Sequence, residues 1–146
     1  MEKVKYKDEK RVSARGIIIN FDKVYLMFRR RKNDDGTYRE YYVVPGGGID
    51  EGEDEIEAVK RELREEFNVE VSVLGKVGCD EGDNSIANFY ALDIKDGIPT
   101  LGGEEKEKCS DENYYEIRLI DIDKLDNIDV SGKEYIIKAY NKEYIN

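Results

Sequence analysis

Residues 45–71 read PGGGIDEGEDEIEAVKRELREEFNVEV, and this stretch decides how the chain folds. Three consecutive glycines are followed by apolar residues spaced three, four and four positions apart, at Ile56, Val59, Leu63 and Phe67. That spacing is typical of a helix with one buried stripe. Asn68 is a residue type that commonly ends a helix in the left-handed conformation. The stretch therefore predicts a glycine loop and then a helix over residues 54–67.

Three glutamates share one flank of this predicted helix. At about 100° per residue, Glu62, Glu65 and Glu66 lie beside the buried stripe and next to one another. They could simply belong to a solvated face with weak ion pairs. However, like charges four residues apart destabilise a helix, whereas clustered carboxylates are ligands that Mg²⁺ or Mn²⁺ accepts. Glycines also let a metal or phosphate approach the main chain, so the pattern favours a cradle for a metal-bound phosphate.

Composition narrows the chemistry further. The chain contains no histidine, which excludes Ser/His/Asp and Cys/His nucleophile systems and HExxH zinc proteases. Any metal would then be a hard cation bound by oxygen atoms, such as Mg²⁺, Mn²⁺ or Ca²⁺. The formal net charge of −10 disfavours binding to nucleic acid polymers, because the protein's field repels their backbone.

The 146 residues fit one domain over positions 1–146. No apolar run approaches the roughly 20 residues that cross a bilayer, and the first residues lack the apolar segment of a secretion signal. Cys79 and Cys109 have no CxxC partner and are expected to be reduced thiols. We therefore expect a cytoplasmic protein without a membrane span.

Further strands are expected where aromatic and β-branched residues gather between turn signals. They cover residues 11–20, 23–31, 37–45, 69–78, 86–94 and 114–122. Strands on both sides of a central helix predict the α/β (α+β) class, with a mixed central sheet and helices packed on it.

The connections carry their own signals. Residues 21–22 predict a hairpin, residues 79–84 an acidic turn, and residues 95–113 a long charged loop. The sequence SGKE at 131–134 is typical of a capping box. It predicts a C-terminal helix whose inner face consists of Ile136, Ala139 and Tyr140.

The quoted stretch resembles the signature of the Nudix hydrolases (MutT-like). That signature is Gly, any five residues, Glu, any seven, then Arg-Glu-apolar-any-Glu-Glu-any-Gly-apolar. Eight of its nine defined positions match here, at Gly47, Glu53, Arg61, Glu62, Leu63, Glu65, Glu66 and Val69. The departure is Asn68 in place of glycine, and Asn tolerates a positive φ. The order of strands and helices also resembles the α/β/α sandwich of that family.

The resemblance implies roles for these residues. The Gly46 carbonyl would hold Mg²⁺, or Mn²⁺ in its place, together with the glutamates at 62, 65 and 66. Glu53 and Arg61 would form an ion pair that fixes the loop against the helix. Water would attack a phosphorus of a nucleoside diphosphate linked to another group. The general base would be Glu62 or a glutamate of the charged loop, namely Glu104, Glu105 or Glu112, and we favour Glu62 over Glu104.

Residues near the glycine loop are candidates for substrate binding. Arginines can bind phosphate and an aromatic ring can stack on a base; the alternatives are surface charge and core packing. Alternation along a strand sends Arg30 to the opposite face from its arginine neighbours at 29 and 31. The candidates are Arg15, Arg30, Arg39, Tyr42, Gly47 and Gly48.

The expected function is hydrolysis of a small diphosphate-linked nucleotide. Nudix enzymes for ADP-ribose often carry a proline about fifteen residues past the signature, and those for dinucleoside polyphosphates a tyrosine slightly further on. Pro99 and Tyr90 fit neither position, so a nucleoside triphosphate or a nucleotide sugar remains open. A noncatalytic domain that senses a nucleotide or metal is the alternative of another class. The sequence leaves the oligomeric state open, a homodimer included.

Overall fold

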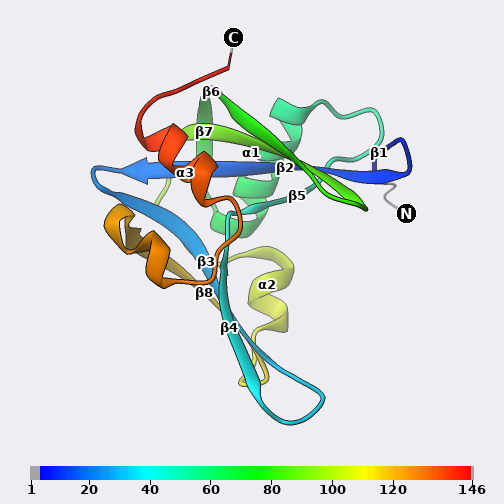
Figure 1. Cartoon of the computed structure of the whole chain (residues 1–146), viewed down its shortest axis with the longest axis vertical. Coiled ribbons are helices and arrows are strands. Elements are labelled where there is room, and N and C mark those ends of the chain that lie inside the picture. The colour runs from blue at the N-terminus through cyan, green and yellow to red at the C-terminus, as the bar shows by residue number, and fades with distance from the viewer. Residues whose placement is uncertain (1–3, 146) are drawn as a thin grey trace.

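Strand β2 (Lys10–Asn20) runs through the centre of the computed structural model, which describes residues 4–145 (Figure 1). It pairs in parallel with β7 (Ser85–Asp96), and β6 (Glu70–Glu81) lies antiparallel on the outer side of β7. Two short strands, β1 (Tyr6–Lys7) and β5 (Gly46–Gly48), pair antiparallel with β2. This part of the sheet is therefore mixed, as predicted.

The sheet divides where β2 meets β3 (Lys23–Lys32). These strands are in register at Ile19 with Val24 and at Asn20 with Lys23. Further along β3, its partner strands are β4 (Tyr38–Val43) and β8 (Asn113–Asp121), both antiparallel. Because β2 and β3 diverge beyond these two pairs, a fork opens between them, and the candidate site lies in it.

Helices cover both faces of β2. The alternation of side chains along a strand sends Ala14 and Ile18 toward α1 (Glu55–Phe67), whereas Ile17 lies in the cluster that contains α3 (Lys133–Tyr140). In Figure 1, α1 lies behind β2 and α3 in front of it. The α/β/α sandwich with a mixed central sheet is thus confirmed.

The ends of α1 follow from its sequence. The Asp54 carboxylate accepts a hydrogen bond from the Glu57 N–H at 2.8 Å, which caps the first turn. Asn68 ends the helix in the left-handed conformation, with φ of 56°, as predicted. Ile56 was expected to be buried, but 44% of it is exposed.

The reason is a rotation of the helix. Its buried apolar residues are Ala58, Val59, Leu63 and Phe67. The buried arc thus contains Ala58 and does not contain Ile56. At about 100° per residue, this places the centre of the arc closer to Glu62 and Glu66. Both glutamates are therefore turned toward the interior and are only partly exposed.

Other differences arise from pairing that no local pattern reveals. The glycine loop forms strand β5, since its backbone hydrogen-bonds to β2. The strands β6 and β7 extend into the predicted acidic turn, which shortens to three residues, 82–84. The charged loop 95–113 contains the helix α2 (Gly103–Lys108), and a 3₁₀ helix, η1 (Ile122–Asn127), follows β8.

The predicted capping box at 131–134 is wrong. The residue before α3 is Gly132 with φ of 88°, and no side chain caps this helix. The helix consequently begins one residue later than a Ser131 cap would require. Its inner face includes Tyr135 beside Ile136 and Ala139, while 40% of Tyr140 is exposed.

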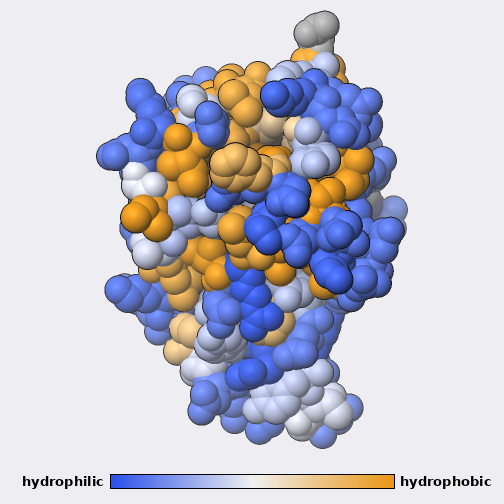
Figure 2. All heavy atoms as spheres, turned by 90° about the vertical axis from the view of Figure 1, so that its left-hand side faces the viewer, coloured by the Kyte–Doolittle hydropathy of each residue, from blue (hydrophilic) through white to orange (hydrophobic). Residues whose placement is uncertain are grey.

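Within residues 4–145, no helix is long and apolar enough to cross a membrane. Cys79 and Cys109 are free thiols, as expected. Figure 2 shows apolar side chains gathering on one face, around the β2–β3 turn and α3. A groove of about 480 Å³ lies there, and Phe21 at its rim is 92% exposed. The oligomeric state stays a prediction.

Candidate active site

The three glycines of β5 bring two chain segments unusually close together. Gly46 has φ of 146°, and a Cβ atom on it would collide with the carbonyl oxygen of Ala14 in β2. A Cβ atom on Gly47 would lie 2.6 Å from the Glu62 Oε1 atom of α1. β5 can therefore lie between β2 and α1 because these positions lack side chains.

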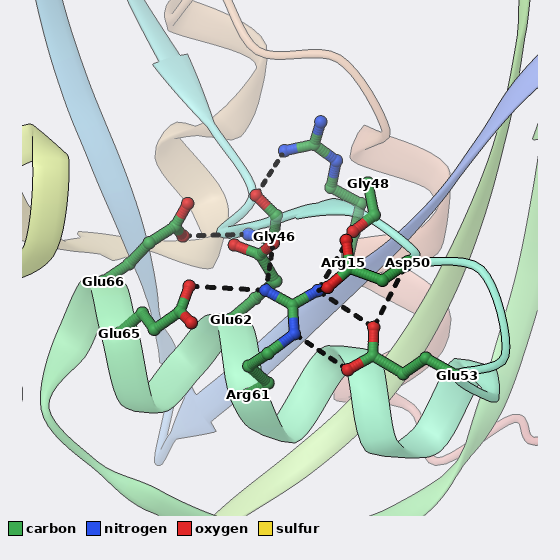
Figure 3. A network of polar contacts seen from close by, with 9 residues as sticks. All are labelled: Arg15, Gly46, Gly48, Asp50, Glu53, Arg61, Glu62, Glu65 and Glu66. Carbon is green, nitrogen blue, oxygen red and sulfur yellow. Dashed lines mark hydrogen bonds and ion pairs between the residues drawn. The ribbon is translucent and has the colours of Figure 1, made fainter. Parts of the chain in front are cut away.

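Two glutamates of α1 converge on this strand. The Gly46 N–H donates a hydrogen bond to the Glu66 carboxylate at 3.1 Å, and the Glu62 carboxylate lies over Gly47. Figure 3 shows both side chains pointing from the helix toward β5. Glu65 is more exposed, at 54% of its side chain. The predicted convergence of helix carboxylates and glycine backbone is present.

Arg61 connects the helix to the turn before it. Its Nε and Nη2 atoms donate to the two oxygens of Glu53 at 2.8 and 3.0 Å, and Nη2 also donates to the Gly48 carbonyl at 3.1 Å. Its Nη1 donates to Glu62 at 3.1 Å and to Glu65 at 3.3 Å. Side chains 61 and 53 are 20% and 15% exposed, so this two-point contact is well shielded from water. The predicted ion pair is present.

The same contacts shift the titration of the pair. Hydrogen bonding to the Arg61 guanidinium lowers the pKa of Glu53 below its ordinary value. The carboxylate in turn raises the pKa of the guanidinium. Glu53 also accepts the Asp50 N–H at 3.1 Å, so one carboxylate holds both the turn and the helix.

For Glu66 and Glu62, burial outweighs the hydrogen bonds that they accept. Burial, and then repulsion from Glu62 and Glu105, raises the pKa of Glu66 to about 8, against the opposing hydrogen bond from the Gly46 N–H. Burial also raises the pKa of Glu62. Two half-buried carboxylates side by side thus hold more negative charge than their surroundings neutralise.

The donor chemistry of these residues fits a hard divalent cation, since carboxylate and carbonyl oxygens are the atoms it prefers. In the structure they are engaged elsewhere: Glu62 and Glu65 with Arg61, and Glu66 with the Gly46 N–H. Accordingly, no three acidic or cysteine side chains among residues 4–145 stand in an arrangement that could hold a metal ion.

Two cavities flank these glutamates. The first, of about 240 Å³, lies in the fork of the sheet and carries two arginines and several apolar side chains: Arg15, Met27, Arg29, Val43, Pro45 and Tyr115, with Gly46, Glu66 and Glu105. The second, of about 450 Å³, is acidic and is lined by Asp50, Glu62, Glu65, Glu66, Glu104 and Glu105, with Val4, Arg11, Gly48, Arg61 and Gly103. The shared residues, Glu66 and Glu105, therefore separate a basic compartment from an acidic one.

Arg15 contributes the buried cation of the first cavity. Its Nη1 donates to the carbonyls of Val44 at 3.2 Å and Gly46 at 3.3 Å, and burial lowers its pKa. The structure thus places this predicted residue in the site. The Gly46 carbonyl, predicted to bind metal, accepts a hydrogen bond from it.

Three predicted substrate-binding residues lie outside both cavities. Arg30 stacks over Tyr114, on the opposite face of β3 from the first cavity, with 5.0 Å to the ring centre. Arg39 pairs with Asp129 at 3.3 Å. Tyr42 packs on the ring of Phe28 and accepts a hydrogen bond from Arg118. Arg30 and Tyr42 lie on the face of their strands that is turned away from the cavity, whereas Arg39, opposite Arg31, shares the face of Arg29 but lies further along β4.

Sequence reasoning did not select, as substrate-binding candidates, three residues that line the first cavity. Arg29 precedes Arg30 and faces the cavity; strand alternation, had it been anchored to Val43 opposite Met27, would have selected it. Tyr115 of β8 gave no local signal. Glu105 was one of several loop glutamates, and its place in both cavities depends on the unpredicted helix α2.

The other two candidate glutamates of the charged loop do not lie in the wall between the two cavities. Glu104 lines the acidic cavity and pairs with Lys108 at 3.4 Å, with 78% of its side chain exposed. Glu112 pairs with Lys32 at 3.2 Å and lines neither cavity.

The model of the Nudix domain matches residues 9–139. The chain belongs to the Nudix family. Nudix hydrolases act on nucleoside diphosphate-linked substrates in general. A comparison with curated proteins yields no match.

Solved Nudix structures share the fold. A MutT Nudix hydrolase from Burkholderia pseudomallei is 18% identical with a TM-score of 0.69, over 90% of this chain and 98% of that one. An ADP-ribose pyrophosphatase from Streptococcus suis is 16% identical with a TM-score of 0.62, over 93% of each chain. A UDP-X diphosphatase is 16% identical with a TM-score of 0.66, over 97% of this chain and 70% of that one. At these identities the likeness establishes the fold, and the substrates in these names belong to those proteins.

Proposed function

We propose that this Nudix protein is a Mg²⁺-dependent pyrophosphohydrolase. It cleaves a nucleoside diphosphate linked to another group, with a nucleoside triphosphate or a related small nucleotide as substrate. The observation that carries the proposal is the placement of two half-buried carboxylates with raised pKa values: Glu66 lies in the wall between the basic and the acidic cavity, and Glu62 lines the acidic cavity beside it. Buried carboxylates without enough positive charge favour a cation in the same place.

The metal, with Mn²⁺ able to replace Mg²⁺, would be held by Glu62, Glu65, Glu66 and the Gly46 carbonyl. It would supply Lewis-acid stabilisation of the phosphate oxygens. Arg61 holds two of these carboxylates and the preceding turn together, so it positions the ligands and does not itself need to contact substrate.

The first cavity supplies the substrate side of the site. Arg15 and Arg29 bring positive charge to it, which attracts phosphate groups toward the shared wall. The apolar lining, with the ring of Tyr115, offers a surface for a base or a sugar. Gly47 and Gly48 contribute because they have no side chains, which leaves room for neighbouring groups such as the Glu62 carboxylate. They need not contact the substrate themselves.

A carboxylate must accept the proton of the attacking water. Glu62 and Glu105 are both placed for this role, because each lines the acidic cavity beside Glu66. Glu104 lies in the same cavity, but it is more exposed and paired with a lysine. We retain Glu62 as the first candidate and add Glu105 from its place in the wall.

Two alternatives remain for comparison. Hydrolysis of a nucleotide sugar or another diphosphate conjugate would use the same machinery with a different group in the first cavity. A noncatalytic domain that senses a nucleotide or metal would bind without turnover. The complete set of signature glutamates favours an enzyme over the sensor, since binding alone does not require all of these carboxylates.

The test is a substrate panel. Nucleoside triphosphates, ADP-ribose, dinucleotides and nucleotide sugars are each incubated with Mg²⁺, and the phosphate-bearing products are separated and quantified. We expect turnover of at least one class, its loss in EDTA, and recovery with Mg²⁺ or Mn²⁺. Binding of nucleotides with no turnover of any class would favour the sensor instead.

The cytoplasmic location and the single domain over residues 1–146 are part of the same proposal. The two free thiols are consistent with a reducing compartment. The small volume of the first cavity and the negative net charge favour a small nucleotide as partner over a nucleic acid polymer.

A further inference from the structure

Beside the first cavity lies a broad groove that the proposed reaction does not use. The groove, of about 870 Å³, lies between the β3–β4 turn and the loop that links α2 to β8. Arg29 and Tyr115 line both the cavity and the groove, so the two spaces are adjacent. The charged side chains of the groove are four cations and two carboxylates: Arg29, Arg31, Lys32, Lys108, Asp34 and Glu112.

Two of these cations stand out because they have no carboxylate partner. Arg29 and Arg31 point to the same face of β3, with Cα atoms roughly 6.6 Å apart. Neither forms an ion pair with any residue between positions 4 and 145, whereas Lys32 and Lys108 each pair with a glutamate. In a chain with 34 acidic and 24 basic side chains, two unpaired arginines on one strand face indicate room for an external anion.

Contacts with two neighbouring residues orient the Arg29 side chain for binding an anion. Its guanidinium lies over the Tyr115 ring at 4.0 Å, and its Nη2 donates to the Asn113 side chain at 2.6 Å. Its Nε–H is buried, and among the residues that the structure describes it has no acceptor. A buried donor without an acceptor costs free energy, and a bound anionic oxygen would remove that cost.

From these observations we infer that the groove binds a second phosphate of the substrate, remote from the diphosphate that is cleaved. The inference rests on the proposed function for the first cavity and names the substrate class: a small nucleotide with an additional phosphate. Two arginines on one strand face suit phosphate, because the planar guanidinium binds two of its oxygens at once. A long nucleic acid does not suit the groove, since the rest of this acidic protein would repel it.

The remote phosphate could be on the ribose or at the end of a longer polyphosphate chain, and binding measurements separate these sources. Calorimetry at fixed ionic strength compares 5′-AMP with adenosine 2′,5′- and 3′,5′-bisphosphate, and ATP with adenosine 5′-tetraphosphate. At least one extended compound should bind roughly tenfold more tightly than its parent, the gain of one charge-assisted contact. The preferred compound identifies the source.

Variants assign the preference to the groove. Arg31→Gln should bring the ratio of affinities close to one without weakening binding of the parent nucleotide, and Arg31→Lys should restore part of it. Arg30→Gln is the matched control, because this arginine lies on the other face of β3, over Tyr114, and it should keep the full preference.

Equal affinities within both comparisons would overturn the inference, as would a preference that survives Arg31→Gln. Tighter binding of a single-stranded RNA oligonucleotide than of any adenosine phosphate would overturn it as well. These measurements need no turnover. A protein that hydrolyses none of the substrates but shows the Arg31-dependent preference would therefore contradict the proposed hydrolase activity and support the phosphate site in the groove.

Discussion

The Glu62 carboxylate lies directly over Gly47, where an added Cβ atom would come within 2.6 Å of its Oε1 atom. Gly47→Ala should therefore push this carboxylate out of place while the backbone of β5 is retained. We expect roughly 10- to 100-fold weaker Mn²⁺ binding, the range seen when support for a metal ligand is lost. Calorimetric titration with Mn²⁺ measures this effect.

Gly82→Ala serves as the control for Gly47→Ala. The nearest atom to an added Cβ atom there is the Ser85 Oγ, at 3.5 Å, an ordinary contact distance. This variant should bind Mn²⁺ as the wild-type protein does. Unchanged Mn²⁺ affinity in Gly47→Ala would mean that the Glu62 position is unrelated to the metal.

Glu66→Gln should abolish most turnover and leave the fold intact. Gln has the same shape and can still accept the Gly46 N–H, but it lacks the charge that a cation requires. We expect kcat to fall by at least roughly 100-fold, as for loss of a charge-stabilising group. Steady-state kinetics and circular dichroism check both parts. Glu51→Gln, at an exposed position in the turn, should keep its rate.

The raised pKa of Glu66, about 8 against an ordinary 4.5, predicts how stability changes with pH. The folded protein holds this proton more tightly than the unfolded chain. The stabilising contribution is therefore complete below about pH 4.5 and is lost as pH rises toward 8. Without metal, the melting temperature of wild type minus that of Glu66→Gln should fall across this window. Added Mg²⁺ should stabilise more at pH 8 than at pH 5.5, and a pH-independent difference would contradict the buried charge.

Arg61→Ala should lower both stability and rate, because it removes five hydrogen bonds and leaves Glu53 buried without its partner. The loss of unfolding free energy should be roughly 2–3 kcal/mol, as for a hydrogen-bonded charge. Urea unfolding of Arg61→Ala, Glu53→Gln and the double variant measures the coupling between the two side chains. Additive losses would show that their contact contributes nothing.

Asn68 gives the departure from the Nudix signature a structural role. Its Nδ2 donates to the Thr100 carbonyl at 3.1 Å, which ties the helix end to the segment leading into α2. Asn68→Gly keeps the left-handed conformation but loses this bond, so it should cost only about 1 kcal/mol while residues 97–103 become more sensitive to protease. Asn68→Asp tolerates the same backbone and loses the same donor, so it should behave alike. Wild-type protease resistance in both variants would contradict the tie.

Local sequence determined much of the fold. Helix α1, its Asp54 and Asn68 ends and the β2–β3 hairpin follow from periodicity and residue type, because each depends on neighbours within a few positions. The Glu53–Arg61 contact was expected from the resemblance to the Nudix signature, because Glu53 lies before the helix and no helical spacing links it to Arg61. The convergence of α1 on Gly46 came from the signature and not from any single residue.

The remaining features depend on packing between distant segments. The rotation that exposes Ile56 is set by where α1 meets the sheet, and the face of β3 that carries Arg29 is set by pairing with β4 and β8. Helix α2 has six residues and no buried side chain. Its position depends on contacts with α1, which no short stretch of sequence encodes.

The fork between β2 and β3 separates the wall that carries Arg29 from the helix that carries the signature glutamates. Two pairs of residues hold the strands together at the hairpin, and beyond it the wall that carries Arg29 is anchored independently of the glutamate helix. Changes in that wall can therefore alter which molecules are accepted without disturbing the reactive centre. With such an arrangement, evolution or protein engineering can change specificity one residue at a time while the glutamate helix stays the same.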